Sequence, residues 1–81
     1  NTMALRIDII SPERQLYSGT ATAVQLPGTE GLFQILTDHA PIMASLTAGQ
    51  VKIDGAAGSE LVSIAGGVVE VSGNTVTVLA L

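Results

Sequence analysis

The sequence contains no cysteine and no tryptophan, and its 81 residues include one tyrosine, one phenylalanine, one histidine and three basic residues. Without cysteine there is no disulfide, no thiolate metal ligand and no cysteine nucleophile. Nucleic-acid binding needs clustered basic residues and, for single strands, aromatic side chains that stack on bases. The scattered basic residues and the formal net charge of −4 therefore argue against nucleic acid as a partner.

Long hydrophobic runs are also missing. No apolar run approaches the roughly 20 residues that a membrane-spanning helix requires, and no basic amphipathic helix could lie on a lipid surface. The pattern of a secretory signal peptide does not occur either. We therefore expect a cytosolic protein that does not insert directly into a membrane.

The sequence consists largely of short aliphatic segments. Hydrophobic residues account for 47% of the chain, and nine glycines and three prolines divide it. Apolar and polar residues alternate from Leu5 to Ile9, as in a half-buried strand. From Thr20 to Leu26, a second predicted strand sets Thr20, Thr22, Val24 and Leu26 on one face against Ala21, Ala23 and Gln25 on the other, and Pro27-Gly28 ends it with turn residues. The period of two predicts strands rather than helices.

The strongest local signal is Gly73-Asn74, which separates two alternating runs and predicts a two-residue hairpin. Pairing Ser72 with Thr75 then puts four valines on one face: Val69, Val71, Val76 and Val78. Each buried valine contributes about 1.5–3 kcal/mol, so this register is strongly preferred over a slip of one residue. The opposite, polar face is left for solvent.

These segments predict an all-β fold of about eight to ten short strands. Two antiparallel sheets packed face to face, a β-sandwich, accommodate strands with one apolar and one polar face. The length corresponds to one domain at most. We expect a single domain over residues 3–81.

Catalytic chemistry has little support in the sequence. The single histidine, His39, follows Asp38, but adjacent residues in an extended or turn segment point apart, so Asp38 is badly placed to orient it. No spacing of His, Asp and Glu resembles a metal site, and no glycine-rich loop is followed by the lysine of a phosphate-binding motif. We expect no catalytic, cofactor-binding or metal-binding residues. A small esterase using His39 stays as a minor alternative.

The segment from Gly28 to Met43 carries apolar residues that a simple fold does not absorb. Leu32 and Phe33 face opposite sides of any strand, so one of them should lie outside the core. An exposed large apolar side chain is a hint of a binding surface. The alternative is that a thin sandwich cannot cover both residues.

Several short motifs, in order and at matching spacing from Leu5 to Ala80, resemble the N-terminal β-sandwich of the epsilon subunit of F-type ATP synthases, which is called delta in mitochondria. They are Ser11-Pro12-Glu13, Leu16-Tyr17-Ser18-Gly19, Val24 to Gly31, His39-Ala40-Pro41, Leu46 to Gly49, Ala65 to Val71, and Val76 to Ala80.

The resemblance implies a non-catalytic rotor subunit of the central stalk that couples proton flow to ATP synthesis by docking on the gamma subunit and on the c-ring. It implies a c-ring interface at Thr29, Glu30, Gly31 and Leu32. It implies a gamma interface at His39, Ala40, Pro41, Ile42 and Met43. The location would be peripheral, at the cytoplasmic face of a bacterial inner membrane, and we expect the isolated chain to be a monomer without cofactor.

Two positions depart from the family's pattern. Leu36-Thr37-Asp38 stands where members often carry an aromatic residue, proline and glycine, and Leu32 stands where an acidic residue is common. The C-terminal helical hairpin of longer members is absent from this sequence, so its inhibitory and ATP-binding roles are not assigned here.

An alternative of a different class is a carrier domain of the lipoyl or biotinyl type, which is also small and all-β. Such a domain needs a modifiable lysine at the tip of a tight hairpin. Lys52 is the only lysine, and the strand-like sequence Val51-Lys52-Ile53 surrounds it.

Overall fold

The computed structural model describes residues 4–81, so Met3, the first residue of the predicted domain, lies outside the described part. Within that range there are nine strands and no helix. The strands are β1 (Leu5–Ile10), β2 (Gln15–Ala21), β3 (Ala23–Gly28), β4 (Gly31–Leu36), β5 (Ile42–Leu46), β6 (Gly49–Gly55), β7 (Gly58–Ile64), β8 (Gly67–Ser72) and β9 (Thr75–Ala80). The number of strands falls within the predicted range.

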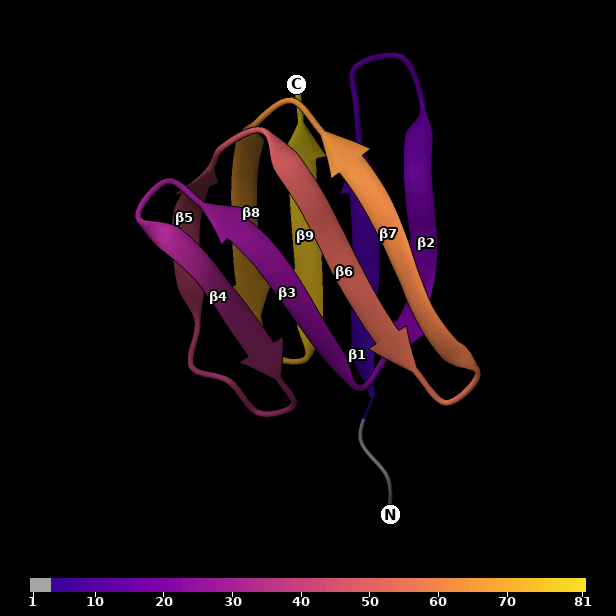
Figure 1. Cartoon of the computed structure of the whole chain (residues 1–81). Helices are drawn as coiled ribbons and strands as arrows, with labels where there is room; N and C mark the ends of the chain where they lie inside the picture. Colours follow the sequence, from indigo (N-terminus) through magenta and orange to yellow (C-terminus); the bar gives the residue numbers. More distant parts are fainter. Residues whose placement is uncertain (1–3) are drawn as a thin grey trace.

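The strands form two layers. Sheet I has the order β2-β1-β9-β8-β5, and sheet II has the order β4-β3-β6-β7. Figure 1 shows sheet II in front of sheet I. The ladder is continuous between the two sheets through one pairing, Gly28 with Leu46, where β3 meets β5. The predicted all-β sandwich is confirmed.

One pairing departs from the antiparallel pattern. β1 and β9 run parallel, with Ile7 beside Val76 and Ile9 beside Val78. These strands are far apart in the chain, so no tight turn forces them to run in opposite directions. The Arg6 N–H also donates to the Asn74 carbonyl at 2.7 Å, which anchors the start of this parallel pair.

The strand predicted from Thr20 to Leu26 is wrong as a single element. The chain breaks at Thr22 and passes from β2 in sheet I to β3 in sheet II. The Thr22 N–H and hydroxyl both donate to the Asp54 carbonyl of β6, at 2.8 and 3.1 Å. Ala21 is buried before this corner, and Ala23, Val24 and Leu26 are buried after it, so the inward-facing positions change phase where the backbone changes layer.

The core lies between the two sheets and consists of aliphatic side chains. No polar or charged residue among residues 4–81 is fully buried. Ser72 pairs with Thr75, and Val69, Val71, Val76 and Val78 are all buried, which confirms the predicted register of the last hairpin. Gly73 has φ of 60°, as the first central residue of a two-residue hairpin turn requires.

Candidate docking surface

The hairpin of β3 and β4 presents the predicted c-ring residues. Gly28 pairs with Gly31 across the two-residue turn Thr29-Glu30, and Gly31 has φ of 123°, a conformation that favours glycine. A Cβ atom on Gly28 would lie 2.7 Å from the Gly31 carbonyl oxygen and 2.8 Å from Cε1 of Phe33. Glycine at both positions therefore lets the turn close over the Phe33 ring.

Two backbone hydrogen bonds fix this hairpin to β5 and to the residue that follows β5. The Thr29 N–H donates to the Ser45 carbonyl at 3.1 Å, and the Thr47 N–H donates to the Pro27 carbonyl at 2.8 Å. Next to these bonds, β4 and β5 leave a hollow of about 480 Å³ between them, which we call the β4–β5 hollow. It is lined by Gly28, Thr29, Glu30, Gly31, Leu32, Phe33, Met43, Ala44 and Ser45.

Leu32 and Phe33 point to opposite sides of β4, as predicted. Leu32 is 67% exposed, whereas Phe33 packs against the core. Met43, on β5, is 70% exposed and lines the same hollow. Two large apolar side chains thus reach solvent from the two strands that border the β4–β5 hollow.

A second hollow, of about 300 Å³, lies on the other side of Met43. Its lining residues are Pro41, Ile42, Met43, Glu70, Val71 and Ser72. Met43 is therefore shared by both hollows. Of the predicted gamma residues, Met43 alone joins the c-ring residues around the β4–β5 hollow.

The loop between β4 and β5 holds His39, Ala40 and Pro41 of the predicted gamma residues, and Ile42 is the first residue of β5. Asp38 has φ of 63°, and Asn74, from the hairpin between β8 and β9, accepts a hydrogen bond from the Asp38 N–H and donates one to the Asp38 carboxylate. The His39 ring Nδ1 donates to the Ala40 carbonyl at 2.7 Å. The carboxylate and the ring thus have separate partners, and no base–orienter pair is assembled between Asp38 and His39.

A row of exposed apolar residues on sheet I escapes the sequence patterns. Val68 pairs with Leu79, and Leu79 lies beside Ile10 in the parallel ladder; all three side chains are exposed on the outer face. Ser45, paired with Val68, connects the row to the β4–β5 hollow. The sequence does contain a sign of this row: each of the three residues is next to a second apolar residue on its strand, and only one residue of such a pair can face the core.

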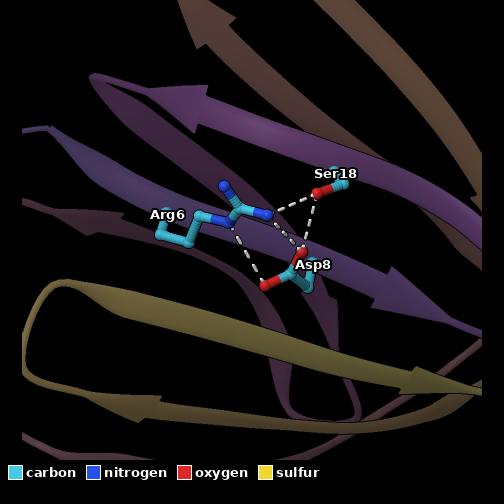
Figure 2. Close-up of polar contacts among 3 residues, drawn as sticks. All are labelled: Arg6, Asp8 and Ser18. Carbon is cyan, nitrogen blue, oxygen red and sulfur yellow. Dashed lines mark hydrogen bonds and ion pairs between the residues drawn. The ribbon is translucent and has the colours of Figure 1, made fainter.

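Figure 2 shows a polar cluster on β1 and β2. Its Asp8 lies two residues before Ile10 on β1, so the cluster borders the apolar row. The Ser18 hydroxyl donates to Asp8 Oδ1 at 2.9 Å, Arg6 Nη2 donates to the Ser18 oxygen at 2.7 Å, and the Arg6 guanidinium lies 3.4 Å from the Asp8 carboxylate. The hydroxyl of Ser18, and then the guanidinium of Arg6, hold the pKa of Asp8 below its usual value. The carboxylate therefore stays charged on this face.

In the part of the chain that it describes, the structure does not place residues as a lipoyl or biotinyl carrier domain or a metal site would need them. Lys52 lies in the middle of β6, paired with Leu61 of β7, while the tip of that hairpin is Ala56-Ala57. Across residues 4–81, no three His, Asp or Glu side chains come together as metal ligands would. Nor does that part of the chain hold a helix with the length and hydrophobicity needed to cross a membrane.

Fold and surface together define a small, helix-free β-sandwich over residues 4–81 that exposes large apolar side chains on its surface. Residues 4–81 match the family described as "ATP synthase, Delta/Epsilon chain, beta-sandwich domain". The chain belongs to this family. The epsilon chain is a non-catalytic subunit of ATP synthase.

Individual relatives agree with this assignment. The chain is 45% identical over 76 residues to the ATP synthase epsilon chain of Rhodobacter capsulatus, which covers 94% of this chain and 58% of the relative. It is 43% identical over 77 residues to that of Chlorobium limicola, covering 94% and 88%. The chain thus spans little more than half of the first relative and most of the second.

Solved structures share the fold at low sequence identity. A chain of the mitochondrial ATP synthase of Euglena gracilis, in a structure of OSCP, F1 and c-ring, superposes with a TM-score of 0.89 at 16% identity, covering 98% of this chain and 51% of that one. A chain from the central stalk and c-ring structure of the Tetrahymena thermophila enzyme gives a TM-score of 0.79 at 17% identity, covering 100% and 66%.

Proposed function

We propose that this domain is a central-stalk component of a proton-translocating ATP synthase that docks on the gamma subunit and on the c-ring and so helps to couple proton flow to ATP synthesis. The observation that carries the proposal is the exposure of Leu32 and Met43 on the two strands that border the β4–β5 hollow. In a chain of this family, large apolar side chains left in solvent are suited to an interface core.

The c-ring contact is assigned to the turn and the first residues of β4. Thr29, Glu30, Gly31 and Leu32 are all exposed at the tip of the β3–β4 hairpin. Two glycines and the hydrogen bonds to Ser45 and Thr47 fix the shape of that tip, so little conformational entropy is lost when it binds. Glu30 adds one negative charge at the rim.

The gamma contact is assigned to the loop and the start of β5, from His39 through Ala40, Pro41 and Ile42 to Met43. The Asn74 side chain holds this loop through its two hydrogen bonds to Asp38. The apolar row of Ile10, Val68 and Leu79 continues the surface across sheet I, with Glu70 and the Arg6–Asp8–Ser18 cluster as its polar rim. An apolar centre with a polar rim is the usual anatomy of a protein interface.

These contacts would place the domain peripherally, at the cytoplasmic face of a bacterial inner membrane, where the c-ring presents its polar loops. Its net charge of −4 opposes self-association, so we propose that the isolated domain is a monomer. No cofactor is required for docking.

Site-specific cross-linking tests both contacts. Because the sequence lacks cysteine, Glu30→Cys and Met43→Cys each provide a unique thiol in an assembled enzyme whose other subunits are cysteine-free apart from reporter positions in gamma and in the c-ring loops. We expect Glu30→Cys to join the c subunit and Met43→Cys to join gamma. Lys52→Cys, exposed on the outer face of sheet II, is the matched control and should join neither. Failure of both test positions, at yields no higher than the control, would contradict the proposal.

A further inference from the structure

β4 is an edge strand whose second side has no partner within residues 4–81: it pairs with β3 alone. The Pro27 carbonyl accepts from the Thr47 N–H and therefore points away from β4. Leu32, opposite Pro27 in the register, then directs its own N–H and carbonyl away from β3. Backbone direction alternates along an antiparallel pair, so Gln34 and Leu36 also direct theirs to the open side.

Natural proteins usually protect such an edge with charges, proline, bulges or a covering element, and β4 has none of the first three. Its sequence, Gly-Leu-Phe-Gln-Ile-Leu, is uncharged and free of proline, and its pairing with β3 runs without a register shift. It also exposes Leu32 and Leu36 on one face. By contrast, two other edge strands carry such protection: β7 contains the charged residue Glu60, and β2 pairs with β1 through a register shift.

Acidic residues stand at both ends of this edge. Glu30 precedes β4 and Asp38 follows it, and both are exposed. No Lys or Arg occurs between Arg14 and Lys52. If two copies paired antiparallel through β4, Glu30 of each would approach Asp38 of the other, and the like charges would oppose the pairing. A basic partner gains from the same two charges.

We propose that the β4 edge binds an extended segment of a second polypeptide by strand addition, and that the segment carries basic side chains at its two ends. The backbone of Leu32 and Gln34 offers a donor and an acceptor each, and Leu36 offers its N–H, since its carbonyl accepts from the His39 N–H. An extended backbone is the ligand that matches these alternating groups, while Leu32 and Leu36 contact its alternate side chains.

This contact shares Glu30 and Leu32 with the c-ring surface proposed above, but it differs from that surface because it uses the outward backbone groups of β4 as far as Leu36. It can therefore be tested without either subunit. The probe is an acetylated and amidated peptide, Lys-Val-Thr-Val-Thr-Val-Thr-Lys, added to the isolated 81-residue chain. A control peptide carries N-methyl groups on alternate residues of one edge, and a second carries them on the other edge.

Amide hydrogen exchange followed by NMR gives the readout. With saturating peptide, exchange at the amides of Leu32, Gln34 and Leu36 should slow at least about tenfold, as for a newly formed ladder. The peptide whose binding edge is methylated should have no effect. Equal protection by all three peptides, protection elsewhere with none on β4, or a β4–β4 dimer of the chain alone would each overturn the proposal.

Variants locate the binding edge. Gln34→Pro removes one outward donor, a change that an edge strand tolerates, and should weaken peptide binding by about tenfold. Ser63→Pro makes the same change at the open edge of β7 and should leave binding unchanged. If Gln34→Pro fails to fold, Leu36→Lys replaces it: its added positive charge should weaken binding of the basic peptide, whereas Leu61→Lys on β7 should not. Equal effects within either pair would refute the assignment to β4.

Discussion

Asn74 holds the Asp38 backbone across 36 residues of sequence: its Oδ1 accepts from the Asp38 N–H at 2.7 Å, and its Nδ2 donates to the Asp38 carboxylate at 3.3 Å. Asp38 is the one residue other than glycine with positive φ among residues 4–81. It stands where members of the family often carry glycine. A short polar side chain tolerates this conformation, and the contact with Asn74 stabilises it, so the loop keeps its shape without the glycine.

This relationship predicts how substitutions at Asp38 will differ. Asp38→Ala keeps the positive φ but loses both the side-chain contact and the polar group that tolerates it, and it should lower the free energy of unfolding by about 1–2 kcal/mol. Asp38→Gly loses the same contact but relieves the strain, so it should stay within about 0.5 kcal/mol of the parent chain. Urea denaturation measures both. Equal destabilisation by the two variants would show that the backbone conformation is not the cause.

Neighbouring residues on β4 provide a matched test of which side faces the core. Ile35 is fully buried, whereas Leu36 is 51% exposed. Ile35→Ala should lower the free energy of unfolding by about 2–5 kcal/mol, because it removes buried methyl groups and leaves a cavity. Leu36→Ala should change it by no more than about 0.5 kcal/mol. Similar losses for the two variants, measured by thermal or urea unfolding, would place both side chains in the core and contradict the observed face.

Gly67, at the start of β8, should be far less replaceable than Gly73 in the following turn. Gly67 has φ of 144°, and a Cβ atom there would collide with the Leu79 carbonyl oxygen and lie 3.1 Å from Cα of Ala80. Gly67→Ala should therefore cost about 3 kcal/mol or more.

Gly73 has φ of 60° with open space around its Cα, so Gly73→Ala should cost about 1–2 kcal/mol. The comparison separates a backbone collision from unfavourable φ alone. It is made by denaturant unfolding of both variants under one buffer condition. A smaller loss at Gly67 than at Gly73 would contradict the close approach of β8 and β9.

Asp8 predicts a pH dependence of stability with a definite sign. Its pKa is lowered in the folded chain by Ser18 and Arg6, so its carboxylate stabilises the folded state above the unfolded pKa of about 3.9. This contribution declines as pH falls below that value and disappears once pH is below the folded pKa.

The test compares the parent chain with Asp8→Asn in urea unfolding from pH 6 to pH 2. The variant should be less stable at pH 6, and the difference should shrink as the pH falls. Ser18→Ala removes the main cause of the lowered pKa, so the stability of this variant should also depend less on pH than that of the parent chain. A difference that is constant over the whole range would mean that the Asp8 carboxylate makes no pH-dependent contribution.

The sequence alone predicts the last hairpin in full, because glycine at the turn and four valines in alternation leave one favourable register. It does not show the corner at Thr22: the adjacent apolar residues Ala23 and Val24 interrupt the alternation there, but that break alone does not say that the chain changes sheet. Nor does it indicate that β1 and β9 run parallel, because pairing between distant strands depends on the whole topology.

The candidate surface was only partly predictable. Because Leu32 and Phe33 are neighbours on one strand, the sequence predicts that one of them leaves the core, but not which one. It does not predict the row of Ile10, Val68 and Leu79, because each lies on a different strand and only the sheet order brings them together. The same holds for Asn74, whose partner Asp38 lies in a distant loop.

The parallel pairing of β1 with β9 has a mechanical consequence. The beginning of β1 and the end of β9 lie at opposite ends of the molecule (Figure 1), and five residue pairs join the two strands between them. A pull applied at those two points loads the inter-strand bonds in shear, so all of them must yield together, whereas a hairpin pulled at its open end unzips one bond at a time. The domain should therefore resist tension along this axis better than its modest size suggests.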